Sequence, residues 1–223
     1  MKNDLEALCQ ACHILYEKGL ICSLGGNVSL RIDDTVYITP TGGALGRLQP
    51  EDMVRVGFEN GITIGDGHPS KELGAHLGML HSNPDLHAVV HVHPTNLIAY
   101  TARYPKLGAF RIVPTNAAFY VRAGQIPLLP YYHSGSAELH QAVSRLAADY
   151  PTIALANHGI MVIRKSLLAA VDVIEEIEQN CEIYLLAGEN GNYLTEKQIR
   201  EIDMALGRNW PEPNKYADLS HGL

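Results

Sequence analysis

The sequence predicts an α/β fold built around one mostly antiparallel or mixed sheet. Two β-hairpin patterns lie close together in the first third of the chain, and the helices and strands that follow do not alternate in a regular βαβ rhythm. The 223 residues, of which 46% are hydrophobic, suffice for one sizeable core, or two small domains at most. We expect one domain over residues 1–223, with residues 210–223 as a C-terminal tail.

The elements of the first third are marked by hydrophobic periodicity and by turn residues. An amphipathic helix is predicted over residues 3–19, and Gly19 ends it. Alternating apolar residues then predict a hairpin that turns at Asp33-Asp34. A second hairpin is predicted to turn at Asn60-Gly61. The next helix is expected to begin at Pro69-Ser70, with Ser70 as its N-cap.

The remaining elements are predicted from apolar runs that are bounded by Gly, Pro and Ser. Strands are expected at residues 88–92, 126–129, 153–156 and 160–163. Helices are expected at residues 95–104, 137–150 and about 166–188, the last ending at Gly188.

Charge and composition exclude several classes of partner. The formal net charge of −7 argues against binding to nucleic acid or to an anionic membrane through bulk electrostatics. No apolar run approaches the ~20 residues of a membrane span, and the N-terminus lacks the apolar block of a signal peptide. We therefore expect a cytoplasmic protein whose four cysteines are thiols.

The stretch "DLHAVVHVHPTN" carries the strongest chemical signal. Alternate residues of a strand share one face, so His91 and His93 point the same way at the end of an apolar run. Zinc favours imidazole, and catalytic zinc sites use about three protein ligands. His158, after the apolar run "TIALAN" and beside Gly159, is the best candidate for the third. His133, in the turn "PYYHSGS", is the alternative.

A carboxylate and several polar turns accompany the histidines. Glu72 follows Ser70 and Lys71, and a helix start with a hydroxyl and a cation suits an anion. The turns "GGN", residues 25–27, and "TPTGG", residues 39–43, offer further backbone N–H groups and short polar side chains. These features together suggest a phosphorylated or carboxylated substrate beside a metal.

The motifs "GGNVS", "TPTG", "PSKE", "AVVHVH" and "ANHG" occur in an order that resembles the class II aldolase/adducin family. The resemblance covers roughly residues 5–200. It implies a three-layer α/β/α domain with a central, mainly antiparallel sheet. It also implies a homotetramer with active sites at subunit interfaces, acting on a small phosphorylated sugar or sugar acid.

The resemblance also implies roles for the residues in these motifs. A divalent metal, usually zinc but also Mn²⁺ or Co²⁺, would be held by His91, His93 and His158, with Glu72 as the acid/base. The residues expected around the phosphate are Asn27, Thr41, Gly42 and Ser70. The metal acts as a Lewis acid that stabilises an enediolate, so the bond that breaks can release either an aldehyde or carbon dioxide.

Two departures from the aldolase pattern bear on the reaction. Lys71 stands where the aldolases carry a serine, and it could pair with a substrate carboxylate. Asn116 stands near the position of the tyrosine that protonates the leaving aldehyde, and Tyr120 is displaced from it by four residues. Loss of that tyrosine impairs aldol cleavage more than decarboxylation. Arg122, Tyr131 and Tyr216 are weaker candidates for contact with substrate or for proton donation.

We therefore expect a metal-dependent carbon–carbon lyase. The chain looks most like the branch of the family that decarboxylates 3-oxo-tetronate 4-phosphate to dihydroxyacetone phosphate. The alternatives are an L-fuculose-phosphate-type aldolase, a sugar-phosphate epimerase and, more remotely, a non-catalytic adducin-like module.

Overall fold

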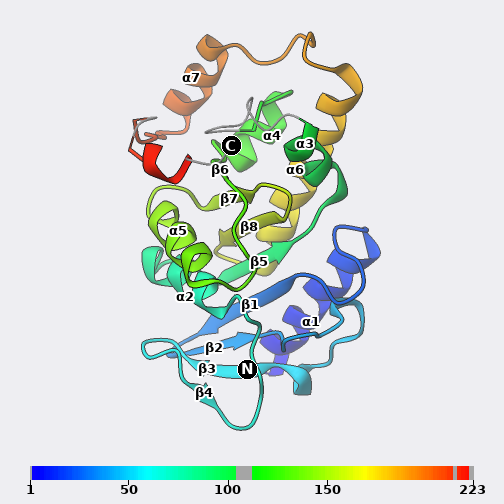
Figure 1. Cartoon of the computed structure of the whole chain (residues 1–223), viewed down its shortest axis with the longest axis vertical. Helices are drawn as coiled ribbons and strands as arrows, with labels where there is room; N and C mark the ends of the chain where they lie inside the picture. Colours follow the sequence, from blue (N-terminus) through cyan, green and yellow to red (C-terminus); the bar gives the residue numbers. More distant parts are fainter. Residues whose placement is uncertain (1, 104–111, 213–214, 221–223) are drawn as a thin grey trace.

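Eight strands form one sheet in the computed structural model, which describes residues 2–103, 112–212 and 215–220 (Figure 1). The strands run in the spatial order β4-β3-β2-β1-β5-β8-β7-β6, and all neighbours are antiparallel except the parallel pair β6 and β7. Their bounds are β1 Asn27–Ile32, β2 Thr35–Ile38, β3 Val54–Gly57, β4 Thr63–Ile64, β5 Ala88–Val92, β6 Leu128–Leu129, β7 Thr152–Leu155 and β8 Gly159–Arg164. The mostly antiparallel sheet is confirmed.

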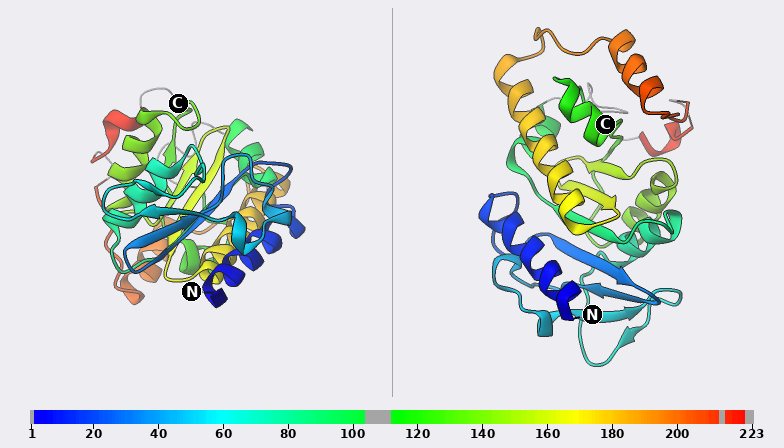
Figure 2. Two further views of the ribbon diagram at one scale, coloured as in Figure 1. Left: turned by 90° about the horizontal axis from the view of Figure 1, so that it is seen from below. Right: turned by 180° about the vertical axis from the view of Figure 1, so that it is seen from behind.

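Helices cover both faces of this sheet and make three layers (Figures 1 and 2). One face packs against α1 (Lys2–Glu17), α3 (Thr95–Arg103), α4 (Ala117–Ala123) and α6 (Leu167–Ala187). The other face packs against α2 (Leu73–Ser82) and α5 (Ala137–Ala147). Since residues of β5 alternate between the two cores, Val90 lies in the first and Val89 in the second. The α/β/α architecture is confirmed.

Both predicted hairpins form. Ile32 pairs with Thr35 across the first turn, where Asp33 adopts a φ of 52°. The second hairpin pairs β3 with a β4 of only two residues. In the part of the chain that the structure describes, none of the helices combines the length and hydrophobicity that a membrane crossing needs.

The start of α2 differs from the prediction. The helix begins at Leu73 rather than at Pro69-Ser70, and Glu72 rather than Ser70 occupies the N-cap position. Pro69 forms an antiparallel bridge with Pro40, and the Ser70 N–H donates to the Thr39 carbonyl. Because Ser70 is held in this extended pairing, the chain needs one more turn before a helix can start.

Two helices and the end of the chain were not anticipated. The helices are α4 and α7 (Glu196–Ala205). Of the stretch expected as a tail, described residues pack on the domain: Trp210 stacks on Tyr150, and Tyr216 is buried. The helix expected at residues 95–104 ends at Arg103, and its last expected residue, Tyr104, lies outside the described residues.

Candidate metal centre

The histidine pair lies at the carboxyl end of β5. Asn27 of β1 pairs with His91 of β5, and strand alternation turns both side chains toward α2. Beyond His93, α3 begins at Thr95, and the Glu178 carboxylate of α6 accepts the backbone N–H groups of Asn96 and Leu97. This capping contact fixes where the strand ends and the helix starts.

His158 reaches the same point from the turn between β7 and β8. The sharp turn comes from Asn157, which has a φ of 57°, rather than from Gly159. Gly159 is needed for space, since a Cβ there would lie 2.2 Å from the Val92 carbonyl oxygen. The glycine therefore lets the turn press against the end of β5 and bring His158 beside the other two rings.

The three imidazoles converge as the sequence predicts. The ring centroid of His91 lies 4.8 Å from the centroid of His93 and 4.8 Å from that of His158. The centroids of His93 and His158 are 5.2 Å apart. One ligand atom from each ring falls within 4.8 Å of the others. His91 Nε2 and His93 Nε2 are 2.9 Å apart. Tetrahedral zinc with Zn–N bonds of about 2.0–2.1 Å spaces its nitrogens by roughly 3.3 Å, so the arrangement fits a metal of this size.

The protonation of these rings also fits a cation. His91 Nδ1 lies 3.0 Å from the Ile160 carbonyl oxygen, which can only accept, so Nδ1 carries a proton and Nε2 is the nitrogen turned toward His93 and Glu72. Burial lowers the pKa of His93 to about 3 and that of His158 to about 4, which keeps both rings neutral. Neutral imidazole is the form that binds metals.

Glu72 faces the three histidines from the turn before α2. Its Oε2 lies 3.1 Å from His91 Nε2, and its Oε1 lies 3.5 Å from His158 Nε2. Asn27 Nδ2 donates to Oε2 and Ser134 Oγ donates to Oε1, each at 2.9 Å. Burial alone would raise the pKa of Glu72, but His91, Asn27, His158 and Ser134 together lower it to about 2. Glu72 is therefore a carboxylate at neutral pH.

A pocket of about 170 Å³ opens beside these groups. All of the residues expected around the substrate line it: Asn27, Thr41, Gly42, Ser70 and Lys71. Ser134 also lines it, from the loop that contains His133, whereas His133 does not. Sequence reasoning passed over Ser134 in favour of its histidine neighbour. The turn "SGS", residues 134–136, was the feature of the sequence that could have pointed to Ser134.

The turns around this pocket offer fewer free backbone donors than expected. The N–H groups of Thr41, Gly43 and Ser70 already donate to carbonyls of the protein. The residues that line the pocket also include Thr41 and Ser70, which carry hydroxyls, and the exposed Lys71, which carries an amine. Side chains therefore add to the donors that an anion could meet there.

The weaker candidates are engaged elsewhere. Asn116 caps α4 through a bond from the Phe119 N–H, and the Tyr120 hydroxyl donates to Asp203. Arg122 pairs with Glu176, and the Tyr216 hydroxyl bonds to Asp149. Tyr131 is 66% exposed. None of these five residues lines the 170 Å³ pocket.

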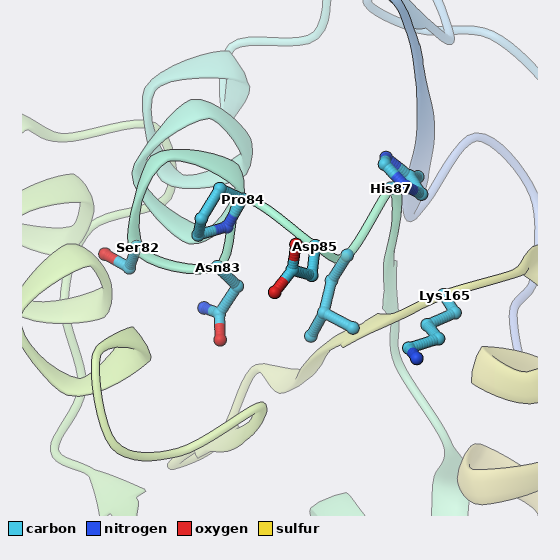
Figure 3. A pocket seen from close by; sticks show the side chains of 7 residues that line it. Ser82, Asn83, Pro84, Asp85, His87 and Lys165 are labelled. Atoms are coloured by element: carbon cyan, nitrogen blue, oxygen red, sulfur yellow. The ribbon is translucent and has the colours of Figure 1, made fainter.

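A larger hollow, of about 780 Å³, lies at the opposite end of β5 (Figure 3). It is lined by Ser82, Asn83, Pro84, Asp85, Leu86, His87 and Lys165. In the close-up the Asp85 side chain points away from Lys165, and the polar groups do not converge on one point. This hollow lacks the chemistry of the smaller pocket.

Comparisons with known proteins agree with the geometry. Residues 6–185 match the family model described as the class II aldolase and adducin N-terminal domain. A 3-oxo-tetronate 4-phosphate decarboxylase of Haemophilus influenzae is 34% identical over 200 residues, which cover 89% of this chain and 95% of that protein. An L-fuculose phosphate aldolase of Methanococcus maripaludis is 34% identical over 79% of this chain and 94% of its own.

A solved structure extends the similarity to three dimensions. The crystal structure of YgbL from Escherichia coli, a candidate aldolase/epimerase/decarboxylase, superposes with a TM-score of 0.84 at 31% identity. The match covers 90% of this chain and 98% of that one.

Proposed function

Because this chain belongs to the class II aldolase and adducin family, we propose that it is a metal-dependent carbon–carbon lyase that decarboxylates 3-oxo-tetronate 4-phosphate to dihydroxyacetone phosphate. The observation that carries the proposal is the convergence of His91, His93 and His158 on one point opposite Glu72. The choice of substrate is supported by the 34% identity to the decarboxylase of Haemophilus influenzae.

His91, His93 and His158 would hold the metal, for which zinc is our first choice because three neutral imidazoles suit it. A divalent ion bound there would supply Lewis-acid stabilisation of negative charge on the substrate oxygens. The His91 Nδ1–H bond to the Ile160 carbonyl keeps its ring oriented for this task.

Glu72 would move the proton. Ionised at neutral pH, it accepts the proton of the substrate hydroxyl next to the ketone as the carbon–carbon bond to the carboxylate breaks and carbon dioxide leaves. It then returns that proton to the carbon that lost carbon dioxide, and one proton from water restores the hydroxyl, which gives dihydroxyacetone phosphate. The Ser134 and Asn27 bonds hold the carboxylate in place through both transfers.

The polar wall of the pocket would bind the two anionic groups of the substrate. Thr41, Gly42 and Ser70 form one side and suit the phosphate. Lys71 is adjacent, and its ammonium would pair with the substrate carboxylate before it departs. A lysine there gives a reason for the pocket to prefer an acid over a neutral sugar phosphate.

An L-fuculose-phosphate-type aldolase is the second candidate, because a relative with that name is also 34% identical. The bonds that engage Asn116 and Tyr120 within this chain leave neither to protonate a leaving aldehyde at its own site. An epimerase would use the same metal centre. A non-catalytic adducin-like role is disfavoured, since the metal ligands and Glu72 are all in place.

We further propose that residues 1–223 form one domain of a cytoplasmic homotetramer whose neighbours complete the site. Leu24 lines the pocket and is 54% exposed, and Tyr131, three residues before Ser134, is 66% exposed. Large apolar side chains beside a catalytic pocket are suited to cover by another subunit. All four cysteines are thiols, which suits a reducing compartment.

The test is direct assay of the zinc-loaded protein with 3-oxo-tetronate 4-phosphate. We expect carbon dioxide and dihydroxyacetone phosphate in equal amounts, with about one divalent ion per chain. L-Fuculose 1-phosphate is offered in parallel. Cleavage of the sugar phosphate without turnover of the acid would replace the decarboxylase assignment by the aldolase.

A further inference from the structure

A chain of buried hydrogen bonds runs behind Glu72, away from the pocket. Ser29 Oγ lies 2.7 Å from His76 Nδ1, His76 Nε2 lies 2.6 Å from Asn27 Oδ1, and Asn27 Nδ2 donates to Glu72 Oε2. Ser29 and His76 are fully buried, and Asn27 and Glu72 are less than 9% exposed. The four residues come from β1, α2 and the turn before α2.

The chemistry of each group fixes the direction of these bonds. A carboxylate only accepts, so the Asn27 amide must present its NH₂ to Glu72 and its carbonyl oxygen to His76. His76 Nε2 must then donate. The buried ring is neutral and has one N–H, so Nδ1 accepts the Ser29 hydroxyl proton. Every donor in the chain therefore points toward Glu72.

His76 holds the Asn27 amide from the side opposite Glu72. Without a donor at His76 Nε2, the buried Asn27 carbonyl oxygen would lose this partner, and the bond to Glu72 alone would fix the amide. A buried imidazole that serves only packing would be more costly than an aliphatic side chain at the same position on α2. The network thus has a use that packing alone does not explain.

We propose that His76 is a positioning residue, which acts through Asn27 to hold the Glu72 carboxylate facing the three histidines. This inference rests on the proposed role of Glu72 as the group that moves the proton. Asn27 then serves mainly to hold Glu72 through one amide proton, and its second amide proton is available to the substrate. Ser29 secures the arrangement by fixing the tautomer of His76.

The activity test compares three substitutions on α2 in the zinc-loaded protein. His76→Leu removes the donor, and His76→Gln keeps an N–H that reaches the position of Nε2. His81→Leu makes the same change at an exposed position of the helix, where the ring bonds to the Phe58 carbonyl and lies against the Phe58 ring. We expect His76→Leu to lower kcat about 10- to 100-fold with KM and metal content little changed. His76→Gln should recover most of kcat, and His81→Leu should match the wild type.

A second measurement needs no substrate and stands apart from the proposed function. Nitrogen-15 NMR of the imidazole rings in the zinc-loaded wild type should find His76 as the neutral Nε2–H tautomer, and Ser29→Ala should loosen that preference. An Nδ1–H tautomer, or equal kcat for His76→Leu and His81→Leu, overturns the proposal. If the acid is not turned over at all, the function fails, while the tautomer still decides the orientation of Asn27.

Discussion

Two hollows lie at opposite ends of β5 and β8, and the smaller of them holds the groups suited to chemistry. The pocket of about 170 Å³ at one end is lined by His93, His158, Glu72 and several polar side chains, and His91 lies beside it in contact with Glu72. The hollow of about 780 Å³ at the other end has a histidine, an acid and a lysine that do not converge (Figure 3). Convergence of buried polar groups, rather than volume, marks the functional end.

The difference has a structural origin. At the functional end, Gly26 and Gly159 allow the backbone to approach so closely that a Cβ on either would lie within 2.8 Å of a carbonyl of residue 91 or 92. This brings β1 and the β7–β8 turn around the end of β5. At the other end, α2 and β5 are joined by residues 83–87, of which Pro84 and Asp85 are exposed and the other three are half-buried.

The largest expected effect separates the histidines of the two ends. His91→Ala or His93→Ala should abolish turnover and reduce the bound divalent ion to well below one per chain, since a zinc site needs about three protein ligands. His87→Ala, in the far hollow, should change neither. Turnover and metal analysis on the three purified variants check this, and a metal-free wild type with full activity would contradict it.

Carboxylates at the two ends should differ almost as much. Glu72→Gln keeps the size of the side chain but removes the proton acceptor, so kcat should fall about 10²- to 10⁴-fold. The three histidines remain, so the metal should be retained. Asp85→Asn in the far hollow is the matched control and should be neutral. Wild-type kcat for Glu72→Gln would remove Glu72 from the mechanism.

The three histidines of the candidate metal centre could be predicted from the sequence because each follows an apolar run. Strand alternation places His91 and His93 on one side, and both sit at the end of an apolar run. His158 also follows an apolar run, and it meets the others because antiparallel strands bring β5 and β8 together. The resemblance to the family supplied the three-layer architecture, which the hydrophobic pattern alone did not.

Other features could not be predicted because they depend on contacts between distant segments. Ser70 resembles an N-cap in the sequence, but its backbone bond to Thr39 holds it outside the helix, which begins at Leu73. Ser134 and His76 gain their importance only once the fold brings them to Glu72 and Asn27. The residues beyond 210 look like a polar tail, yet the aromatic rings of Trp210 and Tyr216 pack on the chain itself.

Acid should destabilise the functional end of the metal-free protein. Unfolded histidine binds a proton below a pH of about 6.5, whereas folded His158 stays neutral until its pKa of about 4. The unfolded state therefore binds more protons in this window. The free energy of unfolding should then fall as the pH drops from 6.5 to 4, by up to about 1.4 kcal/mol per pH unit for each such histidine. Glu72 extends the loss from pH 4.5 down to about 2.

Urea denaturation of chelator-treated protein at several pH values measures this slope. His158→Gln should flatten it, since the replacement does not titrate. His87→Gln should leave the slope as it is. Equal slopes for wild type and His158→Gln would mean that the ring is solvated in the metal-free protein.

The smallest expected effect concerns the lysines of the two ends. Lys71 is exposed at the rim of the pocket, so its ion pair with a substrate carboxylate would be partly screened. Lys71→Ser should weaken binding of a four-carbon sugar-acid phosphate about 5- to 10-fold, and that of the matching sugar-alcohol phosphate much less. Competition assays with these two unreactive ligands give the ratio. Lys165→Ser in the far hollow should leave both affinities unchanged.

Equal losses of affinity for the two ligands on Lys71→Ser would assign the lysine to the phosphate that they share. The preference for an acid would then have to come from another residue.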